Sequence, residues 1–240
     1  MHGMKRFFLL VIFSLLLLSC KKNDSQEKQP IVSTNTKGFK LKGNLEDFYP
    51  KKVFLNKIIE NSIYPIDSSK VIDNTFTFKG IVEFPERFAL TFQDYSSVVI
   101  FILENTNFEL IINTDQINDP IIKGSKLNNE LTEYKTKSKQ IFKKIDYLFP
   151  QFQKARLEND AKELSKIGNE LKSIEKEFIN FSYDYVLQNK NSYIAAMILR
   201  DQLKSTTIDT LKIKKTYQAL SSDVKKSPDA QIIATFLSLH

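Results

Sequence analysis

The sequence predicts an α+β protein in which an antiparallel β-sandwich or barrel-like domain is followed by a C-terminal helical bundle. Two observations predict this division. From Phe39 to about Gly124, short runs of β-branched and aromatic residues alternate with turn residues. Beyond Ser125, apolar residues instead recur at steps of three and four, which is the period of an amphipathic helix. We therefore expect a β domain over residues 38–125 and a helical domain over residues 126–240.

The start of the chain has the pattern of an export signal. Two basic residues precede twelve apolar or small residues, 7 to 18, whereas a helix that spans a bilayer needs about 20. A charged flank before a short apolar run is typical of a secretory signal peptide. The string "LLSC", which ends at Cys20, resembles a bacterial lipobox. We therefore predict a lipoprotein signal peptide over residues 1–19 and a lipidated Cys20 as the first mature residue.

Cys20 is the only cysteine of the chain. It could instead be a buried free thiol, or lie by chance near the end of an ordinary signal peptide. The segment 20–37 disfavours both alternatives, because it is rich in Lys, Asn, Ser, Gln and Thr and offers no core. We expect a flexible tether there, with the acylated Cys20 inserted in a lipid bilayer. The expected location is the cell envelope, anchored to the outer membrane and facing the periplasm.

Eight short runs predict the strands of the β domain. They cover residues 39–45, 51–58, 62–67, 75–83, 87–93, 97–105, 108–115 and 120–125. Asp73 and Asn74 tolerate positive φ and predict a hairpin turn between the third and fourth runs. Phe76 and Phe78 share one face and should point inward with the aromatic residues at 84, 88, 92 and 101. These rings could line a ligand pocket, but packing in the core is the commoner outcome.

Two long apolar stripes predict the first two helices. The first consists of Leu127, Leu131, Tyr134, Ser138, Ile141, Ile145 and Leu148, and the second of Leu164, Ile167, Leu171, Ile174, Phe178, Phe181 and Tyr185. We expect Pro150 to end the first helix, and the similar lengths predict an antiparallel pair. Ser192, Asp209 and Ser227 should cap three further helices, the last with Pro228 in its first turn. Coiled-coil oligomerisation is the alternative to a bundle.

The residue inventory excludes most classes of enzyme. With Cys20 lipidated the mature chain has no free thiol, and its two histidines are His2, within the signal, and His240. Catalytic triads and imidazole-based zinc sites therefore have no internal histidine, and the glycines are too scattered for a phosphate-binding loop. We predict no catalytic residue, no metal site and no cofactor. The carboxylate pairs Glu46/Asp47, Asp115/Asp119 and Glu175/Glu177 are interpreted as solvated surface.

The positive net charge does not predict binding to nucleic acid. Residues 37–126 carry 11 basic and 12 acidic side chains, a net charge of −1, whereas residues 127–240 carry 19 and 14, a net charge of +5. The lysines at 135, 137, 139, 143 and 144 spread around a helix and form no single basic stripe. We interpret them as a solvated helix surface with weak attraction to anionic lipid headgroups.

Several segments resemble a known family. The most similar are "DNTFTFKG" (73–80), "FILEN" (101–105) before "FELIINTD" (108–115), and "KGSKLNNEL" (123–131). They resemble the domain of unknown function that precedes a thioredoxin-like domain in many bacterial envelope lipoproteins. "NKNSYIAAMILRD" (189–201) and "YQALSSDVKKS" (217–227) resemble the helical connector of those proteins. In that family a Cys-x-x-Cys motif in the thioredoxin fold exchanges disulfides.

The resemblance covers nearly the whole mature chain but transfers no catalytic residue, because no position here matches the Cys-x-x-Cys motif. Asn74 stands where the family usually has glycine, a tolerable change at a turn. We interpret the chain as a non-catalytic binding or scaffold module. The alternative is the orphaned or truncated accessory half of a thioredoxin-like oxidoreductase, with a thioredoxin-like protein as its partner. A hydrolase that uses carboxylates alone is a further alternative.

The last predicted helix carries a candidate partner surface. Its apolar residues are Ile232, Ile233, Phe236, Leu237 and Leu239. They cover an arc of about 160°, which is wider than the roughly 100° stripe of a surface helix. Either this helix lies deep in the bundle, or part of the arc is exposed. In the second case we expect Phe236 and Leu237 to help form a docking surface for a second chain or a second copy of this one.

Overall fold

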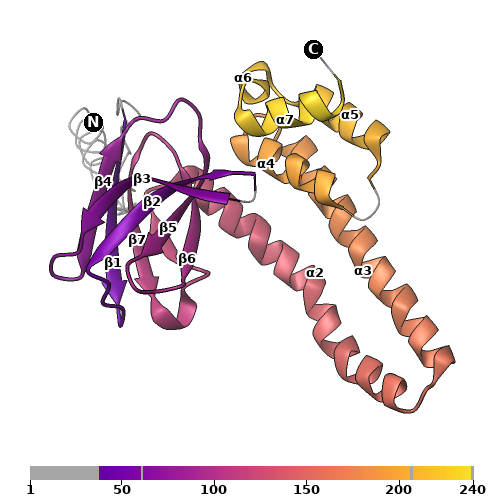
Figure 1. Cartoon of the computed structure of the whole chain (residues 1–240). Coiled ribbons are helices and arrows are strands. Elements are labelled where there is room, and N and C mark those ends of the chain that lie inside the picture. The colour runs from indigo at the N-terminus through magenta and orange to yellow at the C-terminus, as the bar shows by residue number, and fades with distance from the viewer. Residues whose placement is uncertain (1–37, 61, 206–207, 239–240) are drawn as a thin grey trace, which may run out of the picture. The chain divides into compact units, whose positions relative to one another are not determined.

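The computed structural model describes residues 38–60, 62–205 and 208–238, which fall within one compact unit. In this part of the chain eight strands are followed by a series of helices (Figure 1). This order confirms the predicted α+β class. The signal peptide predicted over residues 1–19, the lipidated Cys20 and the tether over residues 20–37 lie outside the described residues.

The strands form two four-stranded sheets. One sheet has the order β4-β1-β7-β8, with β4 Thr75–Gly80, β1 Phe39–Glu46, β7 Asn107–Asn113 and β8 Ile121–Lys123. The other has the order β3-β2-β5-β6, with β3 Ser62–Lys70, β2 Lys52–Ile59, β5 Glu86–Phe92 and β6 Val98–Leu103. Neighbouring strands are antiparallel except β1 and β7, which are parallel. Alternate side chains of both sheets form one buried apolar core.

The predicted turn at Asp73 and Asn74 is present, and both residues have the positive φ that such a turn requires, 48° and 56°. The hairpin is short, because only Ile72 and Thr75 pair across it before β3 and β4 enter different sheets. Phe76 is buried as predicted, and its ring lies against Gly43 on β1, where a Cβ atom would meet it at 2.0 Å. Glycine is therefore required there by close packing.

The predicted inward aromatic residues form core rather than a ligand pocket. Phe78, Phe88, Phe92 and Phe101 are buried with Phe76 in the core between the sheets. The aromatic residue at position 84 is the exception, since it is half-buried and its ring lies 6.4 Å from that of the tyrosine at 193, in the helical part.

Helices α2 (Lys126–Leu157) and α3 (Ala161–Gln188) run antiparallel and side by side (Figure 1). Their two apolar stripes face each other. A hydroxyl contact of 2.8 Å joins Tyr134 to Ser182, and the Lys144 ammonium lies 2.6 Å from the Glu177 carboxylate. The predicted antiparallel pair is therefore present.

The prediction that the first helix ends at Pro150 is wrong, since α2 continues to Leu157. A proline inside a helix lacks the N–H that would bond the carbonyl four residues earlier, here that of Asp146. Both residues are exposed, so that water can bond this carbonyl. Beyond the proline, Phe152 and Ala155 continue the apolar stripe and pack against α3. This packing stabilises the last two turns.

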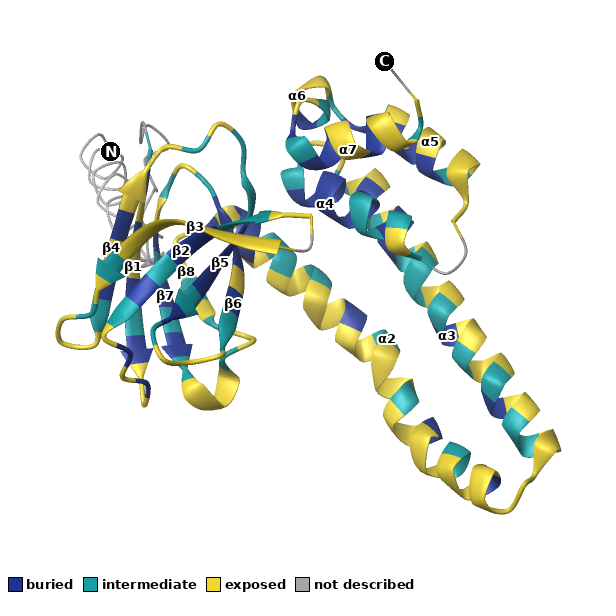
Figure 2. Cartoon of the chain, viewed as in Figure 1, coloured by how far each residue is buried: buried dark blue, intermediate teal, exposed yellow. Residues whose placement is uncertain are grey.

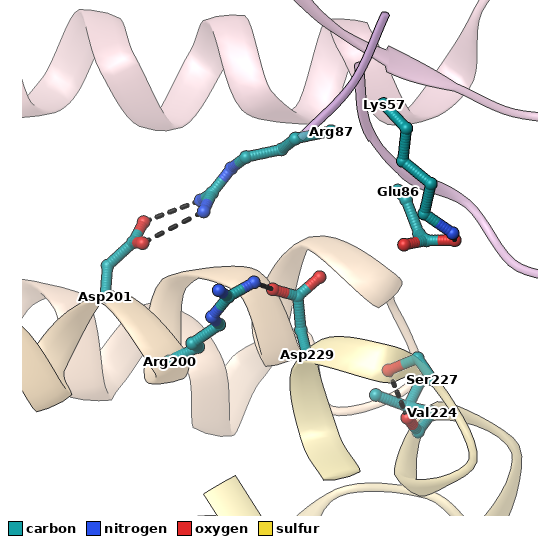
Figure 3. A network of polar contacts seen from close by, with 8 residues as sticks. All are labelled: Lys57, Glu86, Arg87, Arg200, Asp201, Val224, Ser227 and Asp229. Atoms are coloured by element: carbon teal, nitrogen blue, oxygen red, sulfur yellow. Dashed lines mark hydrogen bonds and ion pairs between the residues drawn. The ribbon is translucent and has the colours of Figure 1, made fainter. Parts of the chain in front are cut away.

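Four shorter helices follow: α4 Tyr193–Asp201, α5 Thr210–Ala219, α6 Ser222–Lys225 and α7 Pro228–Phe236. Ser192 and Asp209 cap α4 and α5 through their side chains, as predicted. Ser227 precedes α7 but does not cap it, contrary to the prediction. Its buried hydroxyl instead donates to the carbonyl of Val224 at 2.7 Å and closes the short helix α6 (Figure 3). The sequence patterns did not predict α6.

The short helices share a second apolar core with the end of α3, the start of α2 and Ile102 of β6. Ile102 belongs to the outer face of its sheet and is fully buried there. The helices therefore cover the outer face at that point. Within residues 38–60, 62–205 and 208–238, no helix combines the length and the apolar character needed to cross a membrane.

Candidate functional site

The first turn of α2 is bonded to the edge of the sheet. Asn128 is buried, and its side-chain oxygen accepts from the N–H of Ile102 at 2.9 Å while its amide nitrogen donates to the carbonyl of Ile102 at 2.8 Å. Ser125 caps the same turn, and the Glu104 carboxylate accepts from the Ser125 hydroxyl and from the backbone of Leu127. The Asn128 side chain thus occupies the position of a neighbouring strand at Ile102.

Two arginine–aspartate pairs lie at the junction of the sheet and the helices (Figure 3). Arg87 of β5 donates two hydrogen bonds to the carboxylate of Asp201 at the end of α4, at 2.9 and 2.6 Å. Beside it, Arg200 donates to Asp229 at 2.8 Å, and Asp229 is buried in the first turn of α7. A carboxylate in that turn also interacts favourably with the helix dipole.

The charges of this network support ion pairing rather than proton transfer. Burial alone would lower the pKa of the Arg87 guanidinium, but the charge of Asp201 and its hydrogen bonds outweigh burial and raise that pKa. For the Tyr134 hydroxyl, burial raises the pKa, and this effect is larger than the lowering by its hydrogen bond to Ser182. Both groups therefore remain protonated near neutral pH, and neither is poised to act as a base.

A cavity of about 440 Å³ lies over the arginine pairs, and we call it the junction cavity. Its walls include Ile58 near the end of β2, Arg87 of β5, Tyr134 of α2 and Asp229 of α7. Three other wall residues, Ile100, Leu131 and Lys135, also line a second cavity of about 370 Å³. We call this second cavity the edge groove.

The edge groove lies between α2 and two edge strands. Ile100 of β6 and Ile121 of β8 form one wall, and Leu131, Thr132 and Lys135 of α2 form the other. Both isoleucines are about half exposed. At one end, Lys139 and Asp119 form an ion pair of 2.5 Å, whose hydrogen bond lowers the pKa of Asp119. Within the described ranges, Lys135 has no ion-pair partner.

Residues 39–131 match the model of a domain of unknown function, DUF4369. The DUF4369 segment contains all eight strands and the first turns of α2, and so includes Arg87 and Asn128. Asp201 and Asp229, the partners contributed by the helices, lie outside it. No curated protein matches the chain, and no solved structure matches it.

The two residues predicted to dock a partner differ in their exposure to solvent. Phe236 is 46% exposed, whereas Leu237 is half-buried and packs against the helical core. Ile232, one turn before Phe236, is 41% exposed, and Ile233 between them is fully buried. Part of the apolar arc of α7 is therefore core and part is surface (Figure 2). The predicted lipidation site, Cys20, lies outside the described residues.

Of the carboxylate pairs interpreted as surface, only Asp119 lines one of the two cavities, the edge groove. Glu46, Asp47 and Asp115 are exposed, and Glu177 is paired with a lysine of α2. Among the residues that the structure describes, no group of three or more His, Cys, Asp or Glu side chains could hold a metal ion.

Sequence reasoning missed the five side chains that join the sheet and the helices, which are Arg87, Asn128, Arg200, Asp201 and Asp229. Arg87 and Asp201 are separated by 114 positions, and no local pattern relates them. Asn128 had a weak local signal, since it stands three residues after the helix-capping Ser125. Asp229 follows Ser227-Pro228, a pattern that indicated the helix start without indicating a partner.

Proposed function

We propose that this chain is a lipid-anchored cell-envelope protein that acts as a non-catalytic binding or scaffold module. One observation carries the proposal: the edge groove and the junction cavity meet at Ile100, Leu131 and Lys135 and form one open surface along α2. Apolar walls with a few polar groups at defined places are typical of binding sites. The two arginines in the wall of the junction cavity are paired with aspartates, an arrangement that suits a structural rather than a catalytic role.

The proposed binding surface can be tested in cells by photo-crosslinking. A photoreactive amino acid at position 135 would face the groove, whereas one at position 137 projects about 200° away around α2. Both lysines are exposed, so neither change should affect folding. We expect adducts from position 135 and none from position 137. If position 135 gives no adduct above the level of position 137, the groove is not a binding surface.

The membrane anchor has a separate test. Cys20→Ser should abolish lipid labelling and release the protein from the membrane fraction, because the proposed attachment is the acyl group alone. Ser25→Ala, in the same polar segment, is the matched control and should leave both properties unchanged. Retention of an unlabelled Cys20→Ser chain in the membrane fraction would contradict the anchor.

The alternative function is that of an accessory half of a thioredoxin-like thiol-disulfide oxidoreductase. It is supported by the similarity of residues 189–201 and 217–227 to the helical connector of such proteins. The exposed pair Ile232 and Phe236 on α7 gives a thioredoxin-like partner an apolar surface to contact. With dithiothreitol as the reductant, acceleration by the purified chain of insulin reduction catalysed by a thioredoxin-like protein, above the rate of that protein alone, would favour this alternative if Phe236→Glu abolished it.

A further inference from the structure

Edge strands expose unpaired backbone groups, and most proteins protect them against pairing with another chain. The two sheets have four edge strands, β3, β4, β6 and β8. β3 contains Pro65 and a shift in register, β4 carries Lys79, and β8 has only three residues and follows Pro120. β6 has the sequence VVIFIL, with no charge, no proline and no shift in register. Within the described sheets it is the least protected edge.

The backbone of β6 presents hydrogen-bonding groups to the edge groove. The N–H and C=O of Ile102 point away from β5, because both bond Asn128. Alternate residues of a strand point the same way, so the N–H and C=O of Val98 and Ile100 also point outward. Asn128 reaches only Ile102, and the described residues offer no hydrogen-bond partner to the outward groups of Val98 and Ile100.

The groove beside this edge suits an extended peptide. Its volume of about 370 Å³ is within the usual range of about 300–1,000 Å³ for binding sites. Ile100, 49% exposed, and Ile121, 54% exposed, give alternate side chains of a bound strand an apolar wall. Lys135, which lines the groove without an ion-pair partner, would meet an acidic side chain.

We propose that the edge groove binds an extended segment of a partner protein, which adds to β6 as a further strand and places an acidic side chain at Lys135. The bound backbone bonds Val98 and Ile100, and alternate apolar side chains contact Ile100 and Ile121. This proposal rests on the proposed binding function and names the chemistry of the ligand. Crosslinking from position 135 tests the function, and the pattern of backbone bonding tests the strand.

The test uses a pooled library of nine-residue peptides with Val, Ile, Leu or Phe at alternate positions and one Asp or Glu. For members that bind the full mature chain, fluorescence anisotropy is repeated with each peptide nitrogen methylated in turn. Methylation should weaken binding at two alternate positions, those opposite Val98 and Ile100, by about three- to tenfold each, the effect of one net hydrogen bond. Absence of any binder, or equal effects at successive positions, would overturn the proposal.

Variants of the chain test the same contacts. Ile100→Pro removes the outward N–H of Ile100 and leaves the bonds to β5 intact, and it should weaken binding by at least the same factor. Ser68→Pro, on the opposite edge of the sheet, is its matched control. Lys135→Glu should weaken binding of the acidic peptides, while Lys137→Glu should not. These surface lysine changes keep the proposal testable if Ile100→Pro does not fold.

Two outcomes would assign the edge differently. If both single variants, Ile100→Pro and Lys135→Glu, fold and bind the peptide as tightly as the wild type, the peptide binds elsewhere and the proposal is overturned. A dimer in sedimentation that Ile100→Pro abolishes, with no peptide bound, would assign β6 to a second copy of this chain and would also overturn it.

Discussion

Asn128→Ala tests how α2 is held to the sheet. The change removes the side chain that bonds both the N–H and the C=O of Ile102, a fully buried residue. Each buried backbone group left without a partner costs about 1–3 kcal/mol, so two cost about 2–6 kcal/mol. Alanine has the higher helix propensity and returns about 0.6 kcal/mol. Water that enters from the neighbouring edge groove could pair with one group and reduce the loss.

We therefore expect Asn128→Ala to lower the free energy of unfolding by about 2–4 kcal/mol. A change of about 3 kcal/mol corresponds to a fall in Tm of about 6–12 °C for a chain of this size. Chemical denaturation gives the free energy and calorimetry gives the Tm. Asn129→Ala changes the same residue type at the next, exposed position and should stay within about 0.5 kcal/mol of the wild type. Equal stability of the two variants would refute the role of Asn128 as a substitute strand.

Three further predictions concern the junction and the helices. Arg87→Ala leaves the partly exposed Asp201 carboxylate without its two hydrogen bonds and should lower the free energy of unfolding by about 1–3 kcal/mol. Urea titration measures this change. No measurable change would mean that this ion pair does not stabilise the packing of the helices on the sheet. Burial, chiefly, raises the pKa of Tyr183 to about 12, so its contribution to stability should be complete below about pH 10 and lost as the pH rises toward 12. Tyr183→Phe should remove that component, and an unchanged pH profile would contradict the assignment. Ile233→Glu, at a fully buried site, should unfold the chain or lower its Tm strongly. Phe236→Glu should affect folding little and remove any association through α7. Strong destabilisation by Phe236→Glu would identify that side chain as core.

Local sequence patterns predicted the elements well because the signals for turns, caps and stripes lie within a few residues of each other. Asp73 and Asn74 carry their own preference for positive φ, and Ser192 and Asp209 meet the backbone that they cap within the same turn. The position of β1 beside β7 as a parallel pair was not predictable in this way. Five strands lie between β1 and β7 in the sequence, so no turn or local pattern relates the two. Their pairing depends on the assembly of the whole sandwich.

Patterns failed where a distant partner or the solvent decides the outcome. Pro150 has the local signal of a helix end, but the exposed carbonyl of Asp146 and the packing beyond it allow α2 to continue. Ser227 has the signal of a cap, yet its hydroxyl bonds the preceding helix. The bond between Arg87 and Asp201 spans 114 positions, and only the folded chain brings these residues together.

The edge of β6 is open at Val98 and Ile100 and closed at Ile102, and amide hydrogen exchange measures this difference directly. In the free protein the Ile100 N–H should exchange quickly and the Ile102 N–H, bonded to Asn128, slowly. Addition of a binding peptide from the alternating library should slow exchange at Ile100 and leave Ile102 unchanged. Slow exchange at Ile100 without any peptide, or no slowing when the peptide is bound, would contradict the account.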